Sequence, residues 1–221
     1  MNPMINQNEF VIVLDTETAN SIDDPLCYDV GFAVIDPFTA EVIEAHSFVV
    51  AEIFLDKELM ASAYFADKIP QYEEALRNGE KKLAKFNTIR KVLAETCKRY
   101  KVKKIFAHNM RFDNRSCNTT QRWLTSSKYR YFFPYGIEMW DTLKMARALL
   151  KEDDSYGEFC YENDFLTKNG QRRYTAEIIF RFLVNNVEFV EEHMGIEDVM
   201  IEKEILRHCV QVNPEIDGRL W

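Results

Sequence analysis

Near the N-terminus, two acidic residues separated by one position, Asp15 and Glu17, follow an apolar segment. The preceding residues 10–14 (FVIVL) are mostly β-branched or aromatic, which is typical of a strand buried on both faces. Carboxylates at the end of such a strand are costly to bury unless a cation compensates their charge. Because residues i and i+2 of an extended segment point the same way, both side chains could face one metal site. An isolated Asp-x-Glu is more often part of a surface turn, so its meaning depends on further acids.

Two later segments add such acids. Residues 106–113 (FAHNMRFD) form an apolar run that ends in polar side chains and then Asp113. Residues 193–198 (HMGIED) place His193 five positions before Asp198. Each aspartate is also suited to the N-cap of a following helix, where its carboxylate would accept backbone N–H groups. An isolated histidine is more often structural, but an imidazole with a pKa of about 6.5 can take a proton from water at neutral pH.

The chemistry that these residues favour is metal-assisted phosphoryl transfer. They provide four hard oxygen ligands, and the five cysteines of the chain form no C-x-x-C pair that would indicate a zinc site. A carboxylate set of this kind suits Mg²⁺ or Mn²⁺. Two such ions, roughly 3.5–4 Å apart, can clamp the attacking and leaving oxygens of a phosphodiester.

The elements that would position these residues change from strands to a mixture of strands and helices. The predicted strands are residues 10–14, 30–35, 42–50, 103–107 and 136–140. The predicted helices are 114–124, 142–150, 174–185 and 198–212, together with a helical region over about 58–100 that breaks near Asn78 and Gly79. Residues 151–170 are predicted to be loop-rich. The short connections between the first three strands favour antiparallel pairing. This order implies an α/β fold with a mixed five-stranded sheet and helices covering its faces.

Length and composition predict a single domain over residues 1–221, because 221 residues that are 47% hydrophobic suffice for one core and are few for two. The net charge of −8 argues against a broad basic surface, but carboxylates that bind cations also lower the formal charge of a nuclease. Positive charge gathers at residues 98–104, 111–130 and 172–173. No segment resembles a signal peptide or a membrane span, so we expect a cytoplasmic protein without a membrane partner.

The three acidic segments together resemble the motifs of the DEDDh exonuclease superfamily, which includes polymerase proofreading subunits, ribonuclease T and oligoribonuclease. The Asp-x-Glu, Asn-x-x-Phe-Asp and His-x-x-x-x-Asp motifs of that superfamily correspond, in order, to Asp15 and Glu17; Asn109, Phe112 and Asp113; and His193 and Asp198. The resemblance spans about residues 10–210, and residues 141–143 (DTL) resemble a further common element. Gly195 departs from it, since the family usually has alanine there. The second and third segments are also similar to those of proteins encoded by bacteriophages.

The resemblance implies a ribonuclease H-like fold and a metal-dependent 3′→5′ exonuclease, with the helical region of about 58–100 as an insertion. Its substrate would be the 3′ end of single-stranded nucleic acid, DNA in the first place, and its product nucleoside 5′-monophosphates. A polymerase or a second copy of the chain would be a further partner. The implied site consists of two Mg²⁺ ions, replaceable by Mn²⁺, on Asp15, Glu17, Asp113 and Asp198; His193 as general base; and Thr16, Thr18, Asn109 and Phe112 as substrate-binding residues.

Functions of other classes compete with this hypothesis. A catalytically silent scaffold for a polymerase would keep the fold, although nothing physical would then require four buried acids. A structural protein would use the same acids as helix caps and surface charge. Within the enzyme class, an exoribonuclease is the alternative, because no motif of the sequence reports on contacts to the 2′-hydroxyl.

Overall fold

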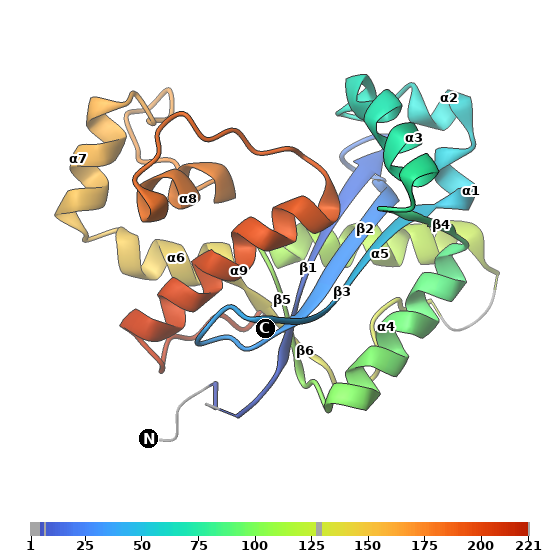
Figure 1. Cartoon of the computed structure of the whole chain (residues 1–221). Helices are drawn as coiled ribbons and strands as arrows, with labels where there is room; N and C mark the ends of the chain where they lie inside the picture. The colour runs from blue at the N-terminus through green and yellow to red at the C-terminus, as the bar shows by residue number, and fades with distance from the viewer. Residues whose placement is uncertain (1–4, 7, 127–129, 221) are drawn as a thin grey trace.

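The computed structural model of the chain describes residues 5–6, 8–126 and 130–220. Within these residues it contains a six-stranded sheet with the order β4-β3-β2-β1-β5-β6 (Figure 1). The strands are β1 (Val11–Ala19), β2 (Leu26–Ile35), β3 (Val42–Val50), β4 (Lys82–Ala84), β5 (Lys104–Ala107) and β6 (Glu138–Asp141). The first three strands pair antiparallel, and the remaining neighbours pair parallel. The predicted α/β fold with a mixed sheet is therefore confirmed.

Helices cover both faces of this sheet, as predicted (Figure 1). On one face lie α1 (Ala51–Phe54), α2 (Lys57–Met60), α3 (Ile69–Asn78), α4 (Phe86–Tyr100) and α5 (Met110–Leu124), with a 3₁₀ turn, η1 (Ala66–Lys68), before α3. On the other face lie α6 (Thr142–Leu150), α7 (Asp154–Glu162), α8 (Ala176–Val184) and α9 (Gly195–Val212). Among the described residues, no helix combines the length and the apolar character that crossing a membrane would require.

The alternation of side chains along β1 decides which face each residue meets. Ile12 and Leu14 belong to the hydrophobic core beside α4 and α5, whereas Val13 belongs to the core beside α6 to α9. Asp15 and Glu17 continue the odd-numbered series, so they point toward the face that α9 covers. Parallel pairing of β5 with β1 ends at Val13. The two acids therefore lie at the carboxyl end of neighbouring parallel strands, where α/β sheets bind ligands.

The structure contains three elements that the sequence patterns did not predict. The first, α1, is a four-residue helix between β3 and the region predicted as helical. β4 lies inside the region predicted as helical and makes the sheet six-stranded rather than five-stranded, since its three residues are too few to show a strand pattern. α7 occupies part of the stretch predicted as loop-rich. Only Tyr156 and Cys160 are buried in α7, so its apolar pattern is weak. The predicted break of the helical region is confirmed at Gly79, which ends α3 with a left-handed φ of 77°.

Candidate active site

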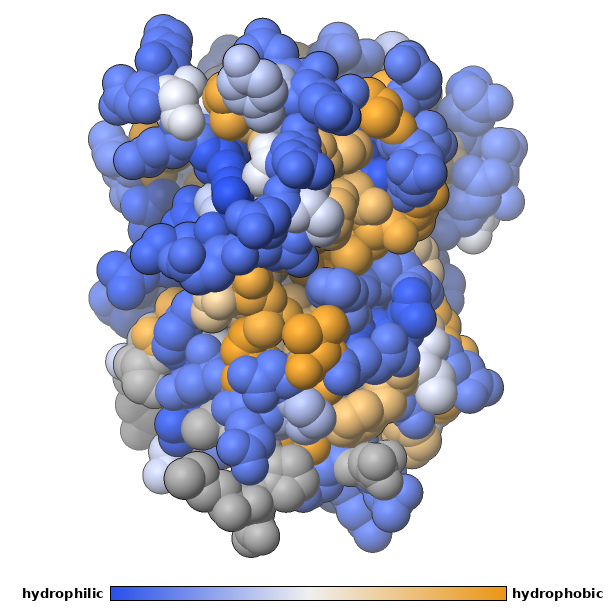
Figure 2. All heavy atoms as spheres, turned by 90° about the vertical axis from the view of Figure 1, so that its left-hand side faces the viewer, coloured by the Kyte–Doolittle hydropathy of each residue, from blue (hydrophilic) through white to orange (hydrophobic). Residues whose placement is uncertain are grey.

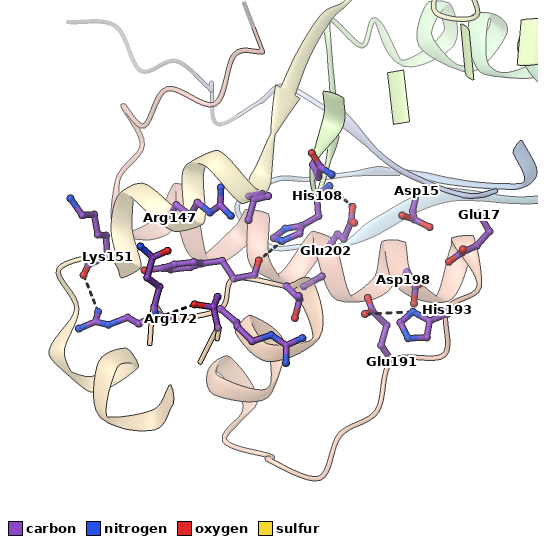
Figure 3. A pocket seen from close by; sticks show the side chains of 18 of the residues that line it. Asp15, Glu17, His108, Arg147, Lys151, Arg172, Glu191, His193, Asp198 and Glu202 are labelled. Atoms are coloured by element: carbon purple, nitrogen blue, oxygen red, sulfur yellow. Dashed lines mark hydrogen bonds and ion pairs between the residues drawn. The ribbon is translucent and has the colours of Figure 1, made fainter. Parts of the chain in front are cut away.

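Asp15 and Glu17 lie within β1, whereas the sequence placed them after a strand ending at residue 14. β1 continues to Ala19 because β2 pairs with it that far, with Gly31 opposite Asp15 and Asp29 opposite Glu17. Both acids line a cavity of about 1070 Å³ that extends from β1 along α9 and α6. Figure 3 shows their side chains at one end of this cavity, beside Asp198, His193 and Glu191. These segments are far apart in the sequence and meet only in the fold.

Asp113 reaches the same end of the sheet from α5. Asn109 precedes this helix with a left-handed φ of 77°, a conformation that asparagine adopts more readily than most residues. The chain therefore turns directly from β5 into α5, and Asp113 lies in the first helical turn rather than at the N-cap. Its buried carboxylate accepts a hydrogen bond from the Thr16 hydroxyl at 2.9 Å. The capping role considered for Asp113 is thus wrong.

His193 and Asp198 come from the N-terminal end of α9, whose N-cap is Met194, so the capping role considered for Asp198 is also wrong. The start of α9 packs directly on the sheet, because a methyl group on Gly31 would lie only 2.3 Å from the carbonyl carbon of Gly195. A methyl group on Gly195 would in turn lie 2.9 Å from the Gly31 nitrogen. Alanine, which the family usually has at this position, does not fit here without a shift. The pair of glycines thus allows α9 to approach the carboxylates of β1.

The His193 imidazole faces the acids from a backbone with a left-handed φ of 54°. One ligand atom each from Glu17, His193 and Asp198 lie within 4.8 Å of one another. The Phe65 ring stacks on the imidazole with a centroid distance of 4.1 Å and an interplanar angle of 10°, and Nδ1 lies 3.8 Å from Glu191 Oε2. Burial lowers the pKa of His193 below its ordinary value. The ring is therefore neutral near pH 7, the form that accepts a proton.

A buried ion pair beneath the site connects the sheet to α9. The Asp29 carboxylate accepts hydrogen bonds from Lys81 Nζ at 3.1 Å, from the Tyr72 hydroxyl at 2.7 Å and from the Gly195 backbone N–H at 2.9 Å. Lys81, which is 2% exposed, also donates to Glu197 Oε2 at 3.2 Å. The region between β3 and α4 is thereby fixed against the start of α9. The sequence analysis missed this contact, although an aspartate inside an otherwise apolar strand was its signal.

The acids of the site have strongly raised pKa values. Burial, and after it the charge of Glu202, holds the pKa of Asp15 well above its ordinary value. Burial is also the largest cause for the others, raising the pKa of Glu17 to about 9, that of Asp198 to about 8 and that of Asp113 to about 7. Buried carboxylates that repel one another retain protons at neutral pH unless bound cations replace those protons.

Two carboxylate oxygens of the site lack the hydrogen-bond partners that buried oxygens normally have. Asp15 Oδ2 and Asp198 Oδ1 are buried and make no hydrogen bond with any residue that the structure describes. Buried carboxylate oxygens in this state are rare and costly. Glu17, His193 and Asp198 are close enough together to hold one ion, whereas Asp113 accepts a hydrogen bond from Thr16 and does not line the cavity. The donors of this set are mainly hard oxygens. The residues present therefore fit the predicted Mg²⁺ or Mn²⁺.

Glu202 is a further acid of the site that the sequence analysis missed. It lies one helical turn after Asp198, so the spacing of four along α9 was the available signal. It is 3% exposed and lines the cavity, and its Oε2 accepts the His108 backbone N–H at 3.1 Å. Burial and the charge of Asp113 raise its pKa well above the ordinary value. Glu202 thus joins the end of β5 to α9 inside the site.

The four residues predicted to bind substrate fall into different places. Asn109 belongs to the described residues that line the cavity, and its backbone N–H donates to Asp141 Oδ1 at 3.1 Å. Thr16 is buried, and its hydroxyl is engaged by Asp113. Thr18 and Phe112 are partly buried and are not among the lining residues. Of the four, Asn109 alone lines the cavity, and a substrate contact stays a prediction for all of them.

Comparison with known proteins shows the fold. No protein-family model and no curated protein matches the chain. The nuclease domain of 3′hExo, described as a DEDDh family member bound to rAMP, is similar with a TM-score of 0.63 and 10% sequence identity, over 95% of this chain and 96% of that one. E. coli Exonuclease I in complex with a dT13 oligonucleotide is similar with a TM-score of 0.58 and 18% identity, over 93% of this chain and 42% of that longer one. The chain therefore has the ribonuclease H-like fold of DEDDh exonucleases, as the motifs predicted.

Proposed function

We propose that this chain is a metal-dependent 3′→5′ exonuclease that hydrolyses single-stranded DNA to nucleoside 5′-monophosphates. The observation that carries the proposal is the pair of buried oxygens, Asp15 Oδ2 and Asp198 Oδ1, which lack any hydrogen bond from the described residues. They lie in a cluster of acids at the carboxyl end of parallel strands and on one wall of a large cavity. The fold shared with 3′-exonucleases supports the direction of hydrolysis.

The proposed reaction assigns a role to each group of the site. Asp15, Glu17, Asp113 and Asp198 would hold two Mg²⁺ ions, or Mn²⁺ in their place, and such ions orient a phosphodiester and stabilise the charge that develops on its oxygens. The neutral His193 imidazole accepts a proton from the attacking water. The water oxygen bonds to phosphorus, the bond from phosphorus to the 3′ oxygen breaks, and that oxygen takes up a proton. A nucleoside 5′-monophosphate leaves the shortened strand.

An exoribonuclease is the second candidate, because the solved structures of similar fold include both kinds of ligand. E. coli Exonuclease I was solved with a dT13 oligonucleotide, whereas the nuclease domain of 3′hExo was solved with rAMP. DNA and RNA differ at the 2′-hydroxyl, so a direct comparison of both substrates is part of the test.

The test is an end-label experiment on single-stranded DNA and RNA, with Mg²⁺ and with a chelator. We expect 5′-labelled strands to shorten stepwise and 3′-labelled strands to release labelled mononucleotide, with Mg²⁺ only. Asp15→Ala should abolish both signals and leave a folded protein, since it removes a buried carboxyl group whose Oδ2 makes no hydrogen bond with a described residue. Glu95→Ala, which removes an exposed carboxylate on α4, is the matched control and should keep full activity. Full activity of Asp15→Ala would refute the proposal.

A further inference from the structure

The cavity of the carboxylates has a second half of opposite charge. Its other end is lined by residues of α6 and, in the connection from α7 to α8, by Thr167 and residues 170–175. Three cationic residues there are exposed, Arg147, Lys151 and Arg173, and we call them the basic arm. Figure 3 shows Arg147 and Lys151 at the end of the cavity away from Asp15 and Glu17. One continuous hollow thus runs from an acidic end to a basic end.

The backbone of the basic arm is held in place by a fourth cation, Arg172. Its Nη1 donates to the carbonyl oxygens of Leu150 at 2.9 Å, Lys151 at 2.9 Å and Asp153 at 2.8 Å, which joins the end of α6 to the start of α7. The ring of His108, next to the carboxylates, lies with Nε2 2.8 Å from the Tyr174 carbonyl oxygen and donates to it when neutral. Arg172 and His108 are therefore structural, and they present the basic arm at a fixed place beside the acidic end.

The cations of the basic arm are free to bind an anion. The Arg173 side chain makes no hydrogen bond or ion pair with another residue that the structure describes. Among the described residues, the Lys151 ammonium group pairs only with the exposed Glu152, at 3.5 Å, and solvent screens this pair. The Arg147 guanidinium lies 5.6 Å from the centre of the Tyr174 ring, so the pair offers a charge and a stacking surface together. Figure 2, which shows this side of the molecule, has mostly hydrophilic residues over its upper part and hydrophobic residues gathered across its middle.

We propose that the basic arm binds the single strand on the 5′ side of the scissile phosphate. This inference rests on the proposed function, which places the scissile phosphate at the acidic end. The strand upstream of that phosphate carries one negative charge per nucleotide, and its bases can stack on arginine or tyrosine. At about 1070 Å³ the cavity exceeds the roughly 300–1,000 Å³ of small-ligand pockets, so it has room for more than the terminal nucleotide. Efficient hydrolysis therefore requires a strand that continues past the scissile phosphate.

The test compares two substrates that differ only in the upstream strand. One is an oligothymidylate, and the other is the p-nitrophenyl ester of thymidine 5′-monophosphate, which replaces the upstream strand by nitrophenol. The double variant Arg147→Gln/Arg173→Gln is compared with Lys98→Gln/Lys168→Gln, which removes two exposed cations that do not line the cavity. We expect the ratio of kcat/KM on the oligonucleotide to kcat/KM on the ester to fall roughly 10- to 100-fold in the first double variant. The ratio should stay unchanged in the control.

A binding measurement separates the two proposals. If the wild type hydrolyses neither substrate, the proposed function is wrong, and anisotropy of a labelled oligothymidylate in chelator then tests the basic arm alone. The slope of log affinity against log salt should be smaller by about 1.4 in Arg147→Gln/Arg173→Gln, for two lost phosphate contacts. An unchanged kcat/KM ratio in Arg147→Gln/Arg173→Gln, which means an equal loss on both substrates, would overturn the inference. Equal binding of the oligothymidylate by the two double variants would also overturn it, and so would no binding by the wild type.

Discussion

At the scale of single residues, the site is a set of acids that must bind either protons or cations. Asp15 and Asp198 each keep one buried oxygen without a hydrogen bond from a described residue, and their pKa values are raised mainly by burial. The same burial lowers the pKa of His193, so the acids tend to be neutral and the base is neutral as well. A bound cation would displace the protons and turn these acids into ligands. The stability of the fold should therefore depend on both pH and metal concentration.

The metal-free protein should lose stability as the pH rises. Unfolded carboxylates have pKa values of roughly 3.9–4.3, whereas folding raises the pKa of Asp113 to about 7, of Asp198 to about 8 and of Glu17 to about 9. An acid whose pKa is higher in the folded state than in the unfolded state contributes its full stabilisation below about pH 4. This stabilisation declines as the pH rises and is lost above the pKa of the folded state. Thermal unfolding in chelator, followed by circular dichroism across this range, checks the expectation.

Mg²⁺ supplies the control for this pH series. Because a bound cation stabilises the deprotonated acids, it should raise Tm most at the alkaline end of the series. A metal-free Tm that rises from neutral to alkaline pH would show that these carboxylates are not protonated in the fold.

Replacing His193 tests the assignment of the general base. His193→Ala should lower the hydrolysis rate by roughly 10²–10⁴, because a positioned general base contributes about that factor. His208→Ala, which removes a partly buried imidazole from a later turn of the same helix, is the matched control and should retain the wild-type rate. Single-turnover rates with Mg²⁺ measure both variants. A His193→Ala rate equal to the wild type would assign the imidazole, stacked on Phe65, to structure alone.

At the scale of elements, the contact of α9 with β2 decides where His193 and Asp198 lie. Gly31 and Gly195 let the backbones approach, and the buried pair of Asp29 and Lys81 fixes the start of α9 to the sheet. Much of the site therefore depends on groups that touch no substrate in the proposed reaction. The N-terminal turn of α9 should move, and the site with it, when this buried pair is broken.

Lys81→Met tests this dependence. Removing one partner of a buried ion pair leaves the other charge uncompensated, at a cost of about 3–5 kcal/mol in the free energy of unfolding. Lys82→Met removes the neighbouring exposed lysine and should change stability by less than about 0.5 kcal/mol. Urea unfolding of the two variants measures the difference. Equal stability of the two variants would show that the Asp29 network does not anchor α9.

The elements also show what the sequence could predict. The central strands and the acids of β1, α5 and α9 were predictable, since each follows from a local apolar run and a motif. The starts of α5 and α9 were not, because the side chains of the N-cap residues Asn109 and Met194 make no capping hydrogen bond, whereas the two aspartates resembled N-caps. The position of Asp29 inside an apolar strand indicated a buried partner, but the hydrogen bond from Gly195 was unpredictable, because it joins residues 166 positions apart.

At the scale of the whole molecule, the proposed function requires a chain of net charge −8 to bind a polyanion at an acidic centre. The fold provides for this by placing the basic arm, Arg147, Lys151 and Arg173, in the same cavity as the carboxylates. Of these residues, only Arg173 lies in a cluster that the sequence singled out, and its partner there, Arg172, is structural. The distribution of charge, rather than its total, therefore makes the proposed function physically consistent.

The most direct measurement of the central claim is a calorimetric titration of the wild type with Mn²⁺ at neutral pH. We expect binding of two ions with release of protons, because the raised pKa values of Asp113, Asp198 and Glu17 mean that metal displaces protons. Asp15→Ala should lose most of the heat, and Glu95→Ala should reproduce the wild type. Absence of Mn²⁺ binding by the folded wild type would contradict the claim that these carboxylates form a metal-dependent active site.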